Sequence, residues 1–260
     1  MKIATWNVNS IKVRLAHVLS WLEGAQPDAL CLQEIKCATD EFPSLELKGL
    51  GYHAAVSGQK TYNGVALLTK DPPEDVRIGL SGDPNDTQSR YIEATVRGVR
   101  IASIYLPNGN PVETDKFAYK LAWMERLMTR ARELLASEMP TVLAGDYNVA
   151  PADADVYDPE AWRGDALCRP ESRRAFRALL HAGFTDAFRV FHPEPHRYSF
   201  WDYQAARWNR DEGLRIDHVL LSPQAADRLV AADIDKAPRG SDKASDHTPV
   251  WCTLAESGSS

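Results

Sequence analysis

The sequence predicts an α/β fold in which mixed β-sheets are covered by helices. Short runs of apolar or β-branched residues recur along the chain, and three longer segments keep a helical spacing of apolar residues. We expect strands at 2–6, 29–33, 63–69, 90–96, 99–106, 141–145, 216–221 and 249–254, and helices at 11–23, 112–137 and 171–182. Only Arg97 and Gly98 separate two of these strands, which predicts a hairpin and excludes a purely parallel sheet.

The composition is that of a globular chain with reduced cysteines. Of the 260 residues, 44% are hydrophobic, and no stretch approaches the roughly 18 apolar residues of a membrane span. The N-terminus turns polar by Asn7, too early for a secretory signal peptide. The four cysteines are scattered without a CxxC spacing. We therefore expect a soluble, cytoplasmic protein with one domain over residues 1–255 and a disordered tail at 256–260.

The net charge of −6 conceals one basic segment. Residues 161–215 hold ten arginines against seven acidic residues, a balance of +3. Five of these arginines lie close together, namely Arg163, Arg169, Arg173, Arg174 and Arg177. Such a segment can contact the phosphates of a nucleic acid while acidic groups elsewhere gather metal ions. An ordinary solvated helix face explains the same spacing equally well.

Polar residues recur where a predicted strand meets a loop, at five separate places in the chain. They are Asn7, Glu34, Asp146, Asn148, Asp217, Asp246 and His247. Rigid strands that deliver carboxylates and amides to a common rim build a metal site, and oxygen ligands suit Mg²⁺. A single Asp or Asn after a strand more often belongs to a turn than to a metal site. Five such places in one chain favour the metal site, because five independent coincidences would otherwise be needed.

These residues lie within motifs that resemble the exonuclease III family of abasic-site endonucleases, from residue 1 to about 254. In chain order the motifs are Asn7-Val8-Asn9, Leu32-Gln33-Glu34, Gly58-Gln59-Lys60, Gly64-Val65-Ala66-Leu67-Leu68-Thr69-Lys70, Tyr105-Leu106-Pro107-Asn108-Gly109, Gly145-Asp146-Tyr147-Asn148, Ser199-Phe200-Trp201-Asp202-Tyr203, Leu214-Arg215-Ile216-Asp217 and Ser245-Asp246-His247. The resemblance implies the DNase I-like fold of the endonuclease/exonuclease/phosphatase superfamily. That fold is a four-layer α/β sandwich of two mixed β-sheets flanked by helices.

The resemblance also implies a role for each residue of the site. Metal ligands would come from Asn7, Glu34, Asp146, Asn148, Asp246 and His247. Glu34 would be the main ligand of Mg²⁺, with Mn²⁺ able to substitute, and Asp246 would assist directly or through water. Asp146 would orient and deprotonate the attacking water, and Asn148 would hold that water or the pentacovalent phosphate. His247, oriented by Asp217, would donate to a phosphate oxygen.

A second group of residues would bind the substrate. Tyr105 would join the catalytic group at the phosphate, and the substrate-binding residues would be Asn108, Phe200, Trp201, Ile216, Arg90, Lys60 and Tyr62. An aromatic pocket at Phe200 and Trp201 would admit a flipped-out sugar that lacks its base. Alternatively, Tyr198, Phe200 and Trp201 are core aromatics of a strand.

The implied activity is that of a monomeric DNA repair nuclease with no membrane partner. It would cut duplex DNA 5′ to an abasic site and also act as a 3′-phosphodiesterase, 3′-phosphatase and 3′-to-5′ exonuclease. Asn9 stands where animal-type members have Asp, Asn108 stands where the prototype has Gln, and the order Phe200-Trp201 is reversed from that prototype. These departures leave the balance among the activities open.

Two alternatives to this activity remain. Superfamily phosphohydrolases that act on other substrates, such as nonspecific DNases and enzymes of lipid phosphates, share the same catalytic pattern. A catalytically dead DNA-binding relative is the other alternative. Such proteins usually lose a metal or base position, whereas every expected position is filled here.

Overall fold

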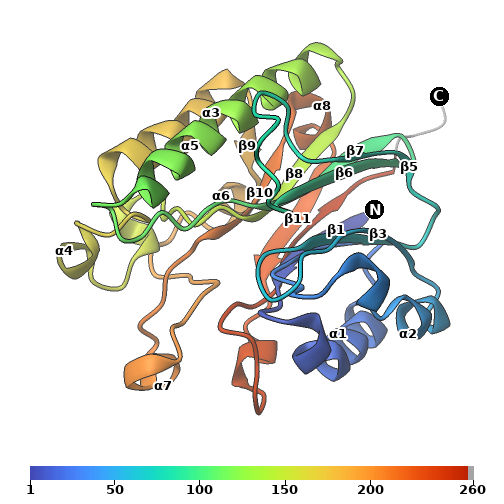
Figure 1. The fold of residues 1–260 in the computed structure, drawn as a ribbon, viewed down its shortest axis with the longest axis horizontal. Coiled ribbons are helices and arrows are strands. Elements are labelled where there is room, and N and C mark those ends of the chain that lie inside the picture. Colours follow the sequence, from blue (N-terminus) through green and yellow to red (C-terminus); the bar gives the residue numbers. More distant parts are fainter. Residues whose placement is uncertain (257–260) are drawn as a thin grey trace.

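Two six-stranded β-sheets pack face to face in the computed structural model, which describes residues 1–256 (Figure 1). Sheet A has the order β11 (Leu229–Ile234), β12 (Val250–Leu254), β1 (Lys2–Asn7), β2 (Ala29–Gln33), β4 (Val65–Thr69), β3 (His53–Ser57). Sheet B has the order β5 (Glu74–Ile78), β6 (Tyr91–Val96), β7 (Val99–Tyr105), β8 (Thr141–Asp146), β10 (Asp217–Leu221), β9 (Thr185–Asp186). Strands β1 and β2 pair in parallel, as do β7 and β8, among antiparallel neighbours. Both sheets are therefore mixed, as predicted.

Helices cover the outer face of each sheet (Figure 1). On sheet A lie α1 (Ile11–Ala25) and α2 (Ser44–Gly49), and on sheet B lie α3 (Asp115–Ala136) and α5 (Pro170–Ala182). The shorter helices are α4 (Pro159–Trp162), α6 (Ala187–Phe191), α7 (Arg207–Arg210) and α8 (Pro223–Ala226). Helices α1, α3 and α5 confirm the predicted helices at 11–23, 112–137 and 171–182 to within a few residues.

Side-chain alternation along the strands separates three apolar layers. In β1, Ile3 packs between the sheets while Ala4 packs under α1. In β7, Ile101 packs between the sheets while Ala102 packs under α3. Each central strand is buried on both faces, which explains why these strands read as nearly continuous apolar runs. The four-layer sandwich implied by the resemblance is confirmed.

The four strands that the apolar pattern did not predict all lie at sheet edges. They are β3, β5, β9 and β11. Every residue of β5 is exposed, and β9 has only two residues. An edge strand need not be buried on both of its faces, and its charged residues discourage pairing with strands of other chains. Such strands therefore carry little apolar signal.

The cysteines and the membrane prediction can also be compared with the structure. All four cysteines are free, as predicted, and all four are buried. Among the helices of residues 1–256, none is long and apolar enough to cross a membrane. The predicted tail at 256–260 lies outside the described residues except for Glu256.

We predict that Gly145→Ala lowers the free energy of unfolding by about 1–3 kcal/mol, because a Cβ at Gly145 in β8 would lie 1.9 Å from the carbonyl oxygen of Ile104 in β7. Urea unfolding followed by circular dichroism measures the change. Gly24→Ala is the matched control: Gly24 lies in α1 with nothing within 4 Å of a Cβ, so the stability should stay the same or rise by up to about 1 kcal/mol. Equal effects of the two substitutions would contradict the prediction.

Candidate active site

The catalytic candidates gather at one rim, where strand ends of the two sheets meet. In sheet B, Asp146 at the end of β8 is in register with Tyr105 of β7 on one side and with Asp217 of β10 on the other. In sheet A, Glu34 directly follows β2, and His247 lies shortly before β12. The strand order therefore determines which of these side chains meet.

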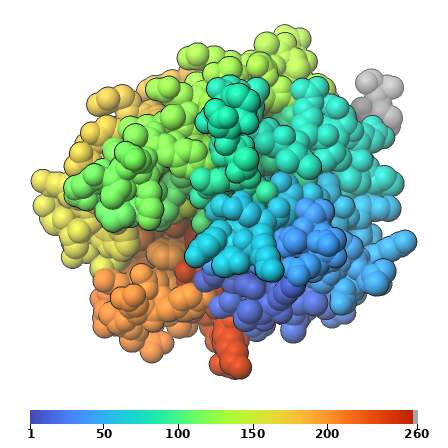
Figure 2. Space-filling model, in the orientation of Figure 1, coloured from blue at the N-terminus to red at the C-terminus, as the bar shows by residue number. Residues whose placement is uncertain are grey.

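A cavity of about 310 Å³ opens at this rim. Figure 2 shows the face of the molecule hollowed where the orange segment around residues 200–210 meets the blue and cyan N-terminal part. One side of the cavity is polar, with Glu34, Asp146 and His247 among its residues. The apolar residues of the lining are Trp162, Leu167, Phe200 and Ile216. The cavity thus places an apolar surface beside the polar candidates.

A buried ion pair joins the two sheets at the site. Nδ1 of His247 donates to Asp217 at 2.9 Å, and both side chains are buried. The hydroxyl of Ser199 donates to the same carboxylate at 2.6 Å and accepts the backbone N–H of Asp217 at 3.1 Å. His247 keeps one free ring nitrogen, Nε2, which lies 3.8 Å from Asp146 Oδ2. Asp217 therefore orients the imidazole toward Asp146.

The surrounding charges favour the imidazolium form of His247. Burial alone would lower the pKa of His247, but the carboxylates of Asp217 and Asp146 outweigh burial and raise the pKa to about 10. Burial raises the pKa of Asp146, and the charge of His247 opposes that shift. A protonated His247 donates a hydrogen bond from Nε2 but cannot bind a metal ion there. The geometry thus favours its predicted role as a phosphate donor over its predicted place among the metal ligands.

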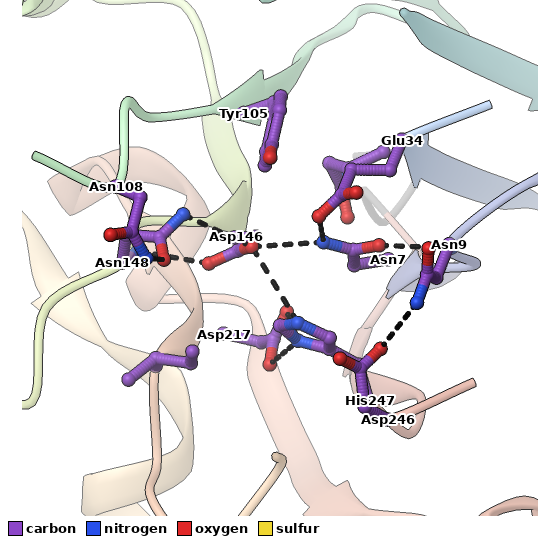
Figure 3. A network of polar contacts seen from close by, with 12 residues as sticks. Asn7, Asn9, Glu34, Tyr105, Asn108, Asp146, Asn148, Asp217, Asp246 and His247 are labelled. Atoms are coloured by element: carbon purple, nitrogen blue, oxygen red, sulfur yellow. Dashed lines mark hydrogen bonds and ion pairs between the residues drawn. The ribbon is translucent and has the colours of Figure 1, made fainter. Parts of the chain in front are cut away.

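Asp146 lies at the centre of the polar network (Figure 3). Its Oδ1 accepts the backbone N–H of Asn148 at 2.9 Å. Its Oδ2 accepts Nδ2 of Asn7 at 2.9 Å and Nδ2 of Asn148 at 3.3 Å. These donors leave the buried carboxylate little rotational freedom, as a base that must meet one water molecule requires.

Glu34 offers the best place for a metal ion. Carboxylate oxygens of Glu34 and Asp146 and a ring nitrogen of His247 lie within 4.8 Å of one another. The ammonium of Lys36 lies 2.8 Å from Oε2 of Glu34 and donates to Oδ1 of Asn9 at 2.6 Å. A cationic group is therefore already held between Oε2 of Glu34 and Oδ1 of Asn9. The donor set fits a hard divalent cation.

Asn7 lies at the site but in an orientation that differs from its predicted role as a ligand. Its Oδ1 accepts the backbone N–H of Asn9 at 3.0 Å, so its Nδ2 points to Glu34 at 2.8 Å and to Asp146 at 2.9 Å. Two sets of contacts determine the orientation of the Asn7 amide. The backbone N–H of Asn9 can only donate, so it faces the amide oxygen, and the carboxylates accept, so they face the amide nitrogen. Burial would raise the pKa of Glu34, but Lys36 and Asn7 hold it below its ordinary value. Asn7 thus joins the two carboxylates through Nδ2, and its Oδ1 accepts the backbone N–H of Asn9.

Asp246 and Asn148 are less directly placed for a metal. Asp246 accepts Nδ2 of Asn9 at 3.2 Å and is not part of the cluster around Glu34, which suits contact through water. The Oδ1 of Asn148 accepts Nδ2 of Asn108 at 3.0 Å, so this oxygen is already engaged. Asn108 therefore lies at the site, as predicted, and holds Asn148 in place.

Tyr105 lines the cavity, and Arg90 packs against Tyr105 without lining the cavity itself. The guanidinium of Arg90 stacks 4.7 Å from the centre of the Tyr105 ring and donates to its carbonyl oxygen at 3.3 Å. Burial, followed by the charge of Glu34, raises the pKa of Tyr105 well above its ordinary value, so the hydroxyl keeps its proton. Lys60 and Tyr62 are exposed in the loop between β3 and β4 and do not line the cavity.

The cavity wall contains Phe200 and Ile216 but not Trp201. Trp201 is 1% exposed, donates from Nε1 to Asp211 at 2.9 Å and packs edge-on against Trp208. In extended backbone, successive side chains point in opposite directions, so Trp201 turns inward where Phe200 faces the cavity. The predicted pocket role of Trp201 is corrected accordingly.

Trp162 and Leu167 complete the apolar part of the lining, and the sequence pattern did not indicate either of them. Trp162 ends the four-residue helix α4 within the arginine-rich segment. Residues 162–167 contain no predicted strand end and no motif of the kind that marked the other residues. Only the juxtaposition of residues 162–167 with Phe200 in three dimensions reveals their place.

The arginines of this segment are partly neutralised. Arg163, Arg169 and Arg173 form ion pairs with Glu160, Glu171 and Asp153, respectively. Arg174 and Arg177 are exposed, and neither forms an ion pair within residues 1–256. Arg163, Arg173 and Arg177 line a second cleft of about 410 Å³, so residues 162–168 separate this cleft from the cavity.

Comparisons with known proteins identify the family and the fold of this chain. A model of the Endonuclease/Exonuclease/phosphatase family matches residues 4–247. The exodeoxyribonuclease III of Haemophilus influenzae is 33% identical over 96% of this chain and 98% of its own length. A 3′ phosphatase from Neisseria, solved with a product DNA hairpin, superposes with a TM-score of 0.96 at 44% identity, covering 98% of this chain and 99% of that one. An AP endonuclease from Archaeoglobus fulgidus superposes with a TM-score of 0.93 at 38% identity, covering 98% and 99%.

We predict that Asp217→Asn lowers the pKa of His247 by removing its closest charged partner. In chelator-treated wild-type protein, histidine NMR should show His247 protonated up to a pH of about 10. Because that pKa lies above the ordinary value of 6.5, the pair stabilises the fold fully below pH 6.5, and the stabilisation is lost as the pH rises toward 10.

His218 is the internal control for this titration. Its Nδ1 lies 3.1 Å from the guanidinium of Arg215, which can only donate, and burial lowers its pKa to about 4. It should therefore stay neutral over the same range in both proteins. A wild-type His247 that titrates near its ordinary pKa would contradict the prediction.

Proposed function

Because the chain belongs to the Endonuclease/Exonuclease/phosphatase family, and within it to the exonuclease III group, we propose that it is a DNA repair nuclease. It hydrolyses the phosphodiester 5′ to an abasic site in duplex DNA and has 3′-phosphodiesterase, 3′-phosphatase and 3′-to-5′ exonuclease activity. The relatives include an AP endonuclease and a 3′ phosphatase solved with DNA, which supports both parts of the proposal.

One observation carries the proposed chemistry: the His247–Asp217 ion pair faces Asp146, and Glu34 lies close to both Asp146 and His247, with one ligand atom from each of the three within 4.8 Å of the others (Figure 3). A phosphate at this place is neutralised from two directions, by the imidazolium and by a cation at Glu34. Phosphodiester hydrolysis needs such neutralisation because negative charge accumulates on the phosphate oxygens. The arrangement supports phosphoryl chemistry rather than acyl or glycosyl transfer.

Within that arrangement each residue has a separate task. Asp146, whose pKa burial raises, accepts the proton of the attacking water, and the side chain of Asn148 holds the water. Nε2 of His247 donates to a non-bridging oxygen, and the hydroxyl of Tyr105 donates to the same phosphate. We propose Mg²⁺ as the resident cation, held by Glu34 and through water by Asp246, with Mn²⁺ able to substitute. The ion would supply charge neutralisation and a Lewis acid for the phosphate.

The cavity supports a substrate that lacks its base. A deoxyribose without a base is small and apolar on one face, and the wall of Phe200, Ile216 and Trp162 offers such a face. At about 310 Å³ the cavity lies at the lower end of the usual range for ligand sites. A nucleotide that keeps its base would need more room than a bare sugar.

The protein's setting follows from the same proposal. We propose that it acts as a monomer over residues 1–255 on double-stranded DNA in the cytoplasm. The four free cysteines suit a reducing compartment. The second cleft, which Arg163, Arg173 and Arg177 line, would lie along the DNA. Residues 162–168 would separate that stretch of DNA from the cavity.

We predict that Asp146→Asn lowers kcat on an abasic duplex by about 100-fold or more, because the water loses its base while the side chain keeps its size and one oxygen that can still accept the backbone N–H of Asn148. A denaturing gel with abasic, 3′-phosphate and undamaged duplexes side by side, in Mg²⁺ at low salt, measures the rates. Chelator should abolish all three. Asp242→Asn, at an exposed position, is the matched control with unchanged rates.

Three outcomes would overturn the proposed function. The proposed function would be wrong if the wild-type protein left both the abasic and the 3′-phosphate duplexes intact with each of several divalent metals. Cleavage of the undamaged duplex in preference to both damaged ones would instead identify a nonspecific DNase. Turnover of a lipid phosphate in preference to DNA would point to the lipid branch of the superfamily.

We predict that Arg177→Ala weakens DNA binding and lowers the slope of log affinity against log salt by about 1, because one phosphate contact is lost. Fluorescence anisotropy of a labelled duplex over a salt series measures the slope, with chelator present to prevent cleavage. Arg132→Ala, at an exposed position near the C-terminal end of α3, should leave the slope unchanged. Identical slopes for both variants would assign the arginines to a merely solvated helix face.

A further inference from the structure

Lys120 is a fully buried lysine beneath the active site. It lies in α3, five residues after the helix begins, and its side chain has no exposed surface. A lysine is almost never buried without partners that satisfy its ammonium group. Burial lowers the pKa of Lys120 to about 7, and the carboxylates of Asp146 and Asp165 oppose that shift. Burying this ammonium group is energetically unfavourable, which indicates that Lys120 has a specific structural role.

The ammonium of Lys120 donates to three backbone carbonyls. They belong to Asn148 at 2.6 Å, Asn108 at 3.0 Å and Ala166 at 3.2 Å. An ammonium has three N–H donors, so all of its donors and all three buried acceptors are satisfied together. No apolar residue of similar size could satisfy these carbonyls.

The three carbonyls belong to three segments that are far apart in the chain and that all line the cavity. Asn108 belongs to the loop after β7, and Asn148 follows β8. Ala166 lies between Trp162 and Leu167 of the apolar wall. One ammonium thus connects the phosphate side of the cavity to its apolar side.

The loop after β7 is built around this lysine. Gly109 has φ +90°, and a Cβ at this position would lie 2.6 Å from Cδ of Lys120. The glycine therefore lets the loop pass directly over the lysine stem. Two independent features, the three hydrogen bonds and the glycine, keep Lys120 and the loop in contact.

We propose that Lys120 is a positioning residue that sets the spacing of Asn108, Asn148 and the wall at residues 162–167. It does not line the cavity and touches no substrate. It acts through Asn148, whose backbone N–H and Nδ2 both donate to Asp146. A shift of Asn148 therefore moves the proposed base, and a displacement of about 1 Å can cost about 100-fold in rate. This inference rests on the proposed function.

Lys120→Met tests it, because methionine has a similar length but no donor. We expect kcat on the abasic duplex to fall about 100-fold while the affinity for Mn²⁺, measured by electron paramagnetic resonance, stays within about threefold. The metal affinity reports Glu34, which Lys120 does not contact, so general unfolding would abolish both. Lys116→Met is the matched control, since Lys116 is exposed one turn earlier on α3. A Lys120→Met protein with wild-type kcat would overturn the proposal.

The variant Lys120→Ala allows a chemical rescue experiment, in which a small amine in the buffer replaces the missing ammonium group. The substitution removes a propylammonium group, so n-propylammonium in the buffer should restore kcat in a saturable way, and 1-propanol, which is uncharged and of the same size, should not. Equal rescue by both compounds would assign Lys120 to packing alone and overturn the proposal. Should neither lysine variant fold, Gly109→Ala keeps Lys120 but displaces the loop, and it must show the same loss of kcat with intact Mn²⁺ binding.

The proposed function and this inference can fail separately. Wild-type cleavage of the abasic duplex tests the function. The ratio of variant to wild-type kcat tests Lys120, on whichever phosphodiester the wild type cleaves, bis-p-nitrophenyl phosphate included. A normal ratio with an active wild type would overturn the inference alone.

Discussion

The active site depends on one buried ion pair, between Asp217 and His247. Asp217 comes from sheet B and His247 from the segment before β12 of sheet A, so the pair connects the two halves of the sandwich. Burying two charges is costly unless their hydrogen bonds are complete. Ser199 completes those of Asp217, and the remaining nitrogen of His247 faces the cavity. The packing of the sheets thus presents an imidazolium to the substrate.

Everything else at the site is arranged around the charge of that imidazolium. Oδ2 of Asp146 lies 3.8 Å from Nε2 of His247, and amide N–H groups donate to both oxygens of this carboxylate, which is therefore held in place as a base beside a cation. Glu34 keeps its negative charge next to Lys36, and its carboxylate lies close to both Asp146 and His247. The imidazolium and a cation at Glu34 would therefore both lie beside the proposed place of the phosphate. Beneath it, Lys120 connects the loops that carry the neutral amides.

The sequence predicts the central strands and the polar site because both depend on local patterns. Central strands are apolar on both faces, and the site residues lie at the ends of strands or just after or just before them, in recognisable motifs. The edge strands escape prediction because their exposed faces carry no such pattern. Trp162 and Lys120 escape it because their roles arise only where distant segments meet. The orientations of Asn7 and Trp201 depend on the hydrogen bonds of Asn9 and Asp211, which no spacing reveals.

The central claim is that the phosphate lies between a metal at Glu34 and a protonated His247. An anomalous difference map from crystals soaked in Mn²⁺ tests it most directly, because it locates the metal relative to both side chains. We expect a peak bonded to the carboxylate of Glu34, with the ammonium of Lys36 displaced and Nε2 of His247 left free. A peak bonded to Nε2 of His247 would contradict the account, since an imidazolium cannot be a ligand.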